Sequence, residues 1–204
     1  RIKSMQTTSG WFAYWQGSND TNLKITPYVV RSLIEMKHLW IELPEWLLEN
    51  SIKYLEKNIK NKGLAHLEKS EIFWALSQSG KNYNIDVKVE ELDRHSLIAY
   101  TYGLILSDKV KNKSTIDKNI EKIKTKILNT NSYNWYWNNL WDKAIFASLL
   151  IDYGYSRDYI DELIGNLYDN DWSSYYYSTQ SKNNAFLAFA KYIEKYSKEN
   201  QTIF

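Results

Sequence analysis

The stretch that decides the fold is Gly10-Trp11-Phe12-Ala13-Tyr14-Trp15, an aromatic turn that stands just before a helical pattern. Two later stretches repeat its character, Tyr133-Asn134-Trp135-Tyr136-Trp137 and Asp171-Trp172-Ser173-Ser174-Tyr175-Tyr176-Tyr177. Segments that recur along a chain bury their apolar faces against their neighbours. The repetition therefore predicts an array of similar helical units.

Composition bounds the class of protein. A chain of 204 residues with 44% hydrophobic and 16% aromatic residues can bury a real core, so one folded domain is expected. The net charge is only +2 and no long run of like charge is present, which gives no sign of a nucleic-acid partner. No apolar stretch approaches the roughly 20 residues of a bilayer span, so we expect no direct membrane insertion by this segment. The absence of cysteine excludes disulfides and thiolate sites.

Apolar and amphipathic helical patterns alternate along the chain. Residues 70–77, 92–106 and 140–153 are apolar nearly all round, whereas 44–59, 115–128 and 156–168 carry one apolar stripe each. Two concentric rings of helices require this alternation, because inner helices are covered on most sides. The pattern predicts an all-α fold, an α/α toroid (partial) with alternating inner and outer helices.

The inner helices are expected to start near residues 26, 69, 92, 140 and 180. The linker 82–88 is too short for a full outer helix. Because successive inner helices point the same way, the aromatic turns should gather at one end of the barrel, and that end is where function is sought. The chain lacks an initiator methionine and reads as if it begins in the last turn of a helix. We therefore expect residues 1–204 to be a single toroid domain, a fragment of a larger multidomain protein.

Carboxylates beside the aromatic turns suggest one enzymatic alternative. A glycoside hydrolase or lyase needs two carboxylates that face each other across a groove, and Asp20, Asp142 and Asp171 are the candidates. Asp142 stands at a helix start, where a capping or dipole role is favoured. A further alternative is a lipid or polyprenyl pocket like that of terpene cyclases, suggested by the spacing of Gln6, Gly10 and Trp11. Bulky side chains on the inner helices are expected to fill such a cavity.

No motif predicts a metal ion, a cofactor or catalytic residues. The segment 169–180 starts like a calcium loop, but Ser174 and Gln180 occupy the positions of its glycine and its glutamate. His38, His66 and His95 have no partner at metal-ligand spacing, and structural roles are expected for them. No phosphate loop or nucleophile elbow is present.

Three parts of the sequence together resemble the thioester-type α/α toroid domain of bacterial alpha-2-macroglobulin-like proteins. They are Met5 to Trp15 with the Thr26-Pro27-Tyr28 helix start, Tyr133 to Trp137 with Asp142 and Ala144, and Ser178-Thr179-Gln180 before Ala185 to Ala190. Their order and spacing agree with the family over essentially the whole chain. Asn183 and Asn184 depart from it, and the family's Cys-x-Glu-Gln thioester is not in this chain, so its position would lie before Arg1.

The resemblance implies a noncatalytic domain of an endopeptidase inhibitor, a protease trap of the periplasm or cell envelope. Its partners would be target proteases, through the full-length protein, and the other domains of the parent. Where the parent has a thioester, the toroid would shield it from water until a protease cuts a bait segment. Trp11, Phe12, Trp15, Trp135 and Trp137 are the residues expected to pack or bind at that aromatic end.

Overall fold

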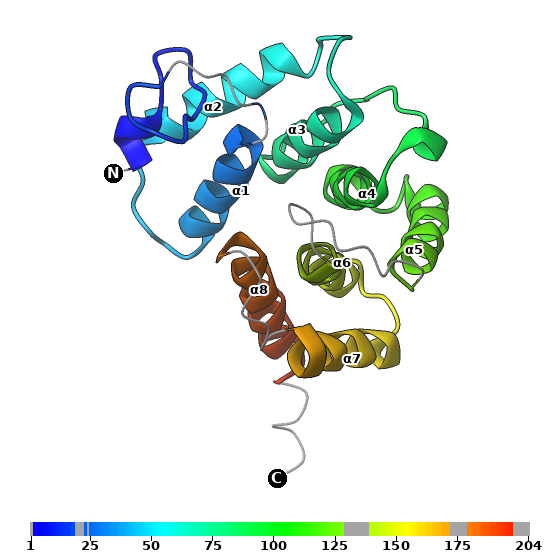
Figure 1. Cartoon of the computed structure of the whole chain (residues 1–204). Coiled ribbons are helices and arrows are strands. Elements are labelled where there is room, and N and C mark those ends of the chain that lie inside the picture. Colours follow the sequence, from blue (N-terminus) through cyan, green and yellow to red (C-terminus); the bar gives the residue numbers. More distant parts are fainter. Residues whose placement is uncertain (1, 19–22, 24, 129–138, 172–178, 198–204) are drawn as a thin grey trace. The chain divides into compact units, whose positions relative to one another are not determined.

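The computed structural model describes residues 2–18, 23, 25–128, 139–171 and 179–197. Its regular elements are helical throughout these residues, and strand pairing in them is limited to one isolated bridge between Gln6 and Phe12. Eight α-helices follow one another in the described part of the chain (Figure 1): α1 (Ile25–His38), α2 (Glu45–Asn58), α3 (His66–Gln78), α4 (Arg94–Asp108), α5 (Lys113–Leu128), α6 (Asn139–Tyr153), α7 (Arg157–Asn166) and α8 (Thr179–Tyr196). Short turns η1 (Ile2–Met5), η2 (Val89–Glu91) and η3 (Leu167–Asp171) complete the list.

The chain divides into two compact units, residues 1–119 and 120–204, and the division falls within α5. In the first unit, α3 and α4 lie side by side (Figure 1), and α1 packs against both α2 and α3. Gly103 permits the close approach of α3 and α4, because a Cβ at this position would stand 2.4 Å from Cδ1 of Phe73. The interior is aliphatic and aromatic, and Leu33, Ile72, Leu76, Leu97 and Ile98 are fully buried.

In the second unit α6 packs chiefly against α8 and also contacts α7. The small residues Ala185 and Ala188 of α8 are fully buried and allow that helix to approach α6 closely. From α6 itself, Ala144, Phe146, Leu149 and Leu150 are also fully buried. The outer helix α7 buries only one stripe, which contains Ile160 and Leu163. This unit therefore repeats the pairing of a broadly buried helix with a one-stripe helix.

The predicted alternation is confirmed in the described residues. The helices expected inside begin at Ile25, His66, Arg94, Asn139 and Thr179, within three residues of the predicted starts. Residues 81–88 form no helix and the short turn η2 follows them, as the length of the linker predicts. None of the described helices combines the length and the hydropathy required to cross a bilayer. The interpretation of residues 1–204 as one domain stays a prediction.

Candidate functional site

The first aromatic turn is fixed to α2 by the side chain of Gln6. Its Nε2 donates to the backbone oxygen of Leu47 and to Oγ of Ser51, both at 2.7 Å, and lies 3.3 Å from the backbone oxygen of Gly10. Ser51 in turn donates to the oxygen of Leu47 at 2.9 Å. One amide thus joins the N-terminal segment, defined here as residues 2–18, to the middle of a helix more than 40 positions later.

Gly10 lets the turn lie directly on α2. Its φ of +90° lies in the region that favours glycine, and a Cβ there would stand 2.2 Å from the backbone oxygen of Asn50. The backbone N–H of Thr7 donates to the oxygen of Trp11 at 2.9 Å and closes the turn. The Gly-aromatic pair of the sequence therefore marks a close backbone approach in which no larger residue fits.

The structure places the predicted aromatic residues in different environments. Phe12 is 1% exposed and Trp11 is 6% exposed, and the backbone N–H of Phe12 donates to Oγ1 of Thr26 at the start of α1. Trp15, by contrast, is 73% exposed. Trp135 and Trp137 lie outside the described residues. The structure therefore joins the first aromatic turn to α1 and α2, and the gathering of all three turns stays a prediction.

A buried ionic cluster, which the sequence analysis did not identify, joins three helices of the first unit. Glu71 on α3 forms an ion pair with Arg31 of α1, and its Oε1 lies 2.9 Å from Nε2 of His95 on α4. All three residues are less than 9% exposed. Asp93 begins α4 by accepting a hydrogen bond from the backbone N–H of Ser96 at 2.7 Å, which places His95 in the first turn. The predicted structural role of His95 agrees with this position.

Aromatic rings cover the cation of this cluster. The guanidinium carbon of Arg31 lies 3.7 Å from the centroid of Trp74, within the range of a cation–π interaction. Trp74 stacks on Tyr102 with centroids 4.6 Å apart and planes inclined by 15°. The charge of Arg31 is therefore held between a carboxylate and an aromatic face, away from water.

Opposing effects set the protonation of Glu71. Burial by itself raises the pKa of this carboxyl, but the charge of Arg31 and the hydrogen bond with His95 outweigh it and lower the pKa from 4.5 to about 2. Glu71 is therefore ionised at neutral pH and acts as the acceptor at the centre of the cluster. Because the cluster links α1, α3 and α4 and lies in the interior, its chemistry suits positioning of helices.

Of the three carboxylates proposed for the enzymatic alternative, the structure describes the side chain of Asp142 alone, so their predicted approach to one another stays a prediction. Asp142 is in the first turn of α6 and is 1% exposed. Asp20 lies outside the described residues, and only the backbone of Asp171 is described, at the end of η3. Over the same described residues, no group of three or more acidic or histidine side chains is arranged to hold a metal ion.

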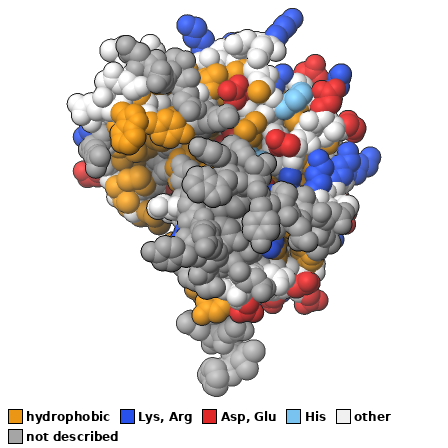
Figure 2. All heavy atoms as spheres, viewed as in Figure 1, with side chains coloured by type: hydrophobic (Ala, Val, Ile, Leu, Met, Phe, Trp, Pro, Cys, Tyr) orange, Lys and Arg blue, Asp and Glu red, His pale blue; other side chains and the backbone are white. Residues whose placement is uncertain are grey.

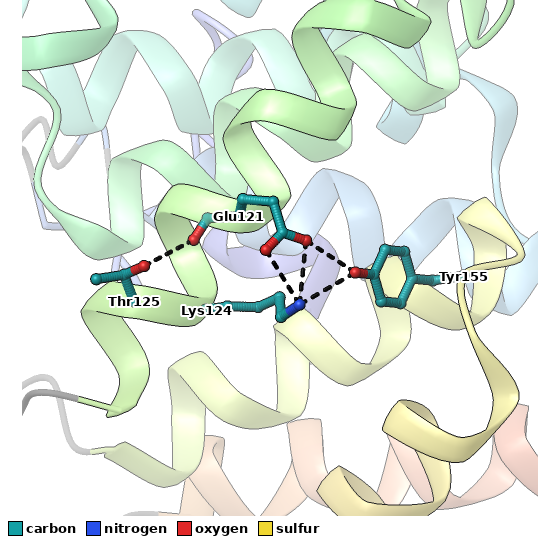
Figure 3. Close-up of polar contacts among 4 residues, drawn as sticks. All are labelled: Glu121, Lys124, Thr125 and Tyr155. Carbon is teal, nitrogen blue, oxygen red and sulfur yellow. Dashed lines mark hydrogen bonds and ion pairs between the residues drawn. The ribbon is translucent and has the colours of Figure 1, made fainter.

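A second polar cluster lies on the outer helices of the second unit (Figure 3). The hydroxyl of Tyr155 donates to Glu121 at 2.8 Å, and Nζ of Lys124 lies 3.1 Å from both the same carboxylate and the Tyr155 oxygen. The ammonium also lies 4.8 Å from the ring centroid of Tyr159. The side chain of Glu121 is 62% exposed, so this cluster faces water and ties α5 to the turn before α7.

Part of the chain is similar in sequence to a known bacterial protein. No family model matches the chain. Over 59 residues, which are 29% of the chain and 4% of the relative, it is 30% identical to alpha-2-macroglobulin of Xylella fastidiosa. The predicted resemblance to bacterial alpha-2-macroglobulins is thereby confirmed at the level of sequence for part of the chain.

Solved structures extend the comparison to nearly the whole chain. Alpha-2-macroglobulin of E. coli in its native conformation matches 95% of the chain with a TM-score of 0.72 and 18% identity. The E. coli structure that spans domain MG7 to the C-terminus matches with a TM-score of 0.71 and 16% identity. Salmonella alpha-2-macroglobulin reacted with methylamine matches with a TM-score of 0.75 and 18% identity. The chain spans 13%, 33% and 14% of these three structures. The predicted fold class, an all-α fold of the α/α toroid type, is confirmed.

Proposed function

We propose that this chain is a noncatalytic domain of a bacterial alpha-2-macroglobulin-like endopeptidase inhibitor, a protease trap. The observation that carries the proposal is the structural match over 93% to 95% of the chain with alpha-2-macroglobulins of two bacteria. The partners would be target proteases, engaged by the full-length protein, and the other domains of the parent. By the same resemblance, the parent would act in the periplasm or at the cell envelope.

The contribution of this domain would be to protect a reactive group. A strained acyl–sulfur bond survives only where water is excluded, and buried aromatic side chains provide such surroundings. Trp11 and Phe12 are buried beside α1 and α2 and suit this packing. Trp15, with Trp135 and Trp137, would complete the aromatic end around a thioester if the parent has one. In a parent without a thioester, the domain would act as a docking surface within the trap or within an envelope scaffold.

Burial of Asp142 supports a noncatalytic role over the carbohydrate enzyme. A glycosidase needs two carboxylates that reach the substrate from opposite sides of an accessible groove. Asp142 is 1% exposed and stands where carboxylates stabilise the N-terminal end of a helix. We therefore assign it to the stability of α6.

The test uses the full-length parent protein. Incubated with trypsin, it should retain the protease so that a large protein substrate is no longer cut while a small peptide substrate still is. If the parent contains Cys-x-Glu-Gln, part of the trypsin should migrate with the parent on a denaturing gel, and a Cys→Ala variant should lose that covalent adduct. Undiminished cleavage of the large substrate would contradict the proposal. Release of sugars by the parent, abolished in Asp142→Asn, would favour the carbohydrate enzyme.

A further inference from the structure

One face of α2 is buried and the opposite face is charged. Leu47, Ser51 and Leu55, which recur every four residues, are fully buried in the first unit. Residues two positions from these lie on the opposite side of the helix, because successive residues are rotated by about 100°. They are exposed and form the outward face of α2, which carries Glu45, Glu49, Lys53 and Lys57. Figure 2 shows Lys or Arg side chains that project from the upper edge of the view, where α2 lies in Figure 1.

The order of these charges is symmetric about Ser51. Each acidic residue before Ser51 has a basic residue at the same distance after it: Glu49 and Lys53 at two positions, Glu45 and Lys57 at six, and Glu42 and Lys60 at nine. All six residues are exposed. If a second copy of the helix runs in the opposite direction, every acidic residue lies beside a basic one. The outward face is therefore complementary to itself, which is the requirement of an interface with two-fold symmetry.

Contacts within the chain do not explain this order. None of the six side chains forms an ion pair in the described part of the chain. Like charges stand four positions apart in each half of the helix, and such neighbours repel each other. The helix dipole favours acidic residues in the first turn and basic residues in the last turn, so it accounts for Glu45 and Lys57. Glu49 and Lys53 lie between those turns, where the dipole has little effect.

We propose that the outward face of α2 is a docking surface for a second copy of this chain. The two copies of α2 run antiparallel, and their two-fold axis lies level with Ser51. The surface lies wholly within the first unit, because α2 belongs to that unit. The proposal goes beyond the protease trap and does not depend on it.

A common class of helix packing suits this surface. The four charges of the helix lie on one ridge of every fourth residue, and two such ridges pack together when the helices cross at about 50°. In the antiparallel arrangement Glu49 lies beside Lys53 of the second copy. Glu45 in the same way lies beside Lys57, and the two-fold axis repeats each contact. Trp46, next to Glu45, is 49% exposed and adds apolar area to the contact.

The first experiment is sedimentation equilibrium of the whole 204-residue chain between about 1 µM and about 1 mM, a range that covers weak association. We expect a reversible equilibrium between monomer and dimer in about 0.02 M salt. Because salt screens exposed ion pairs, about 0.5 M salt should weaken the dimer about tenfold or more. Association through apolar surface is not weakened by screening. A chain that stays monomeric throughout, or a dimer that salt leaves unchanged, would overturn the proposal.

Exchanged charges identify the surface. Glu45→Lys with Glu49→Lys makes the outward face basic. Lys53→Glu with Lys57→Glu makes it acidic. Each double variant alone should dimerise at least about tenfold more weakly than the wild type, because like charges then meet across the two-fold axis. An equimolar mixture of the two variants should associate about as tightly as the wild type, since every basic residue again lies beside an acidic one.

The matched control is Lys111→Glu with Lys118→Glu, the same charge change at two other exposed lysines of the first unit. This control should dimerise like the wild type, and an equal loss in it would attribute the effect to net charge and overturn the site. A mixture of the basic and acidic variants that stays monomeric would overturn the pairing of the two ridges. A basic or acidic variant that alone associates as tightly as the wild type would assign the dimer to another surface and overturn the proposal.

Discussion

The molecule contains two polar clusters built from the same kinds of group but held in different surroundings. In the first unit, Glu71 accepts from Arg31, and Trp74 covers the cation. In the second, Glu121 accepts from Lys124 and Tyr155, and the ring of Tyr159 lies under the ammonium. The exposed fraction of the central glutamate side chain is 7% in one cluster and 62% in the other.

This difference in exposure decides what each cluster does. Water competes for every partner in the outer cluster, so the interaction is weak and salt screens it. In the inner cluster no water replaces a lost partner, and each group becomes indispensable to the others. The inner cluster therefore specifies how α1, α3 and α4 meet, while the outer one adds a small increment to the contact between α5 and the turn before α7.

The largest effect should follow from Glu71→Gln. This change keeps the shape of the side chain but leaves the charge of Arg31 buried without a counter-ion, which should lower the free energy of unfolding by about 3 to 5 kcal/mol. The matched change in the outer cluster, Glu121→Gln, should alter it by less than about 1 kcal/mol. Urea denaturation followed by circular dichroism measures both. Similar losses in the two variants would contradict the distinction between the clusters.

Acid should weaken the inner cluster within a defined range of pH. Because the pKa of Glu71 is lowered from 4.5 to about 2 in the folded state, its stabilising contribution is complete above pH 4.5 and is lost as the pH falls toward 2. Urea midpoints between pH 5 and 2 should therefore fall more steeply in the wild type than in Glu71→Gln. Glu121→Gln serves as the control and should follow the wild type closely. A wild-type midpoint that stays constant over this range would argue against the ionised carboxylate.

A smaller effect of opposite sign is expected at Trp40. Glycine accepts its φ of 60° without strain, and the exposed ring contributes little packing, so Trp40→Gly should raise the free energy of unfolding by about 0.5 to 1 kcal/mol. Trp15→Gly, at another exposed tryptophan without a positive φ, should give no gain. Thermal unfolding distinguishes the two variants. A Trp40→Gly protein that is less stable than the wild type would show that the ring packs in solution.

The smallest effect should be the coupling within the outer cluster. A double-mutant cycle with Glu121→Gln and Lys124→Met should give an interaction free energy between the two side chains of about 0.2 to 1 kcal/mol at low ionic strength. In 1 M salt this interaction free energy should be close to zero. The corresponding cycle with Arg31→Met and Glu71→Gln should keep its coupling in high salt. If salt reduced both couplings equally, burial would not be the cause of the difference.

The sequence predicts the helices well because their pattern reports burial directly. Ile72 to Leu76 are apolar on all sides, and α3 is correspondingly buried nearly all round, whereas α7 buries only the stripe that its periodicity indicates. The inner cluster was not predicted from the sequence, because Arg31 and Glu71 are 40 positions apart and Glu71 and His95 are 24 positions apart. None of the three belongs to a recognised motif. A usable signal did exist, since Glu71 is the only charged residue between Ser70 and Gln78 in an otherwise apolar run.

The aromatic turn was located by its residues, but its environment was not predictable from them. Trp11 and Trp15 belong to the same stretch and have the same side chain, yet one is 6% and the other 73% exposed. Gln6 and Gly10, which precede Trp11 in the chain, contact α2 directly, and Trp15 stands five positions after Gly10. Such a long-range contact leaves no periodic trace in the sequence.

The attachment of Gln6 to α2 also sets an order for folding. Its partners Leu47 and Ser51 stand 41 and 45 positions later and are correctly placed only once α2 has formed and packed on α1. Contacts that close a long loop form after those that are local, because chain entropy opposes them. The N-terminal segment is therefore synthesised before α2 but docks late, and until then the apolar surface that will receive Phe12 beside Leu33 of α1 and Leu47 of α2 stays open to solvent.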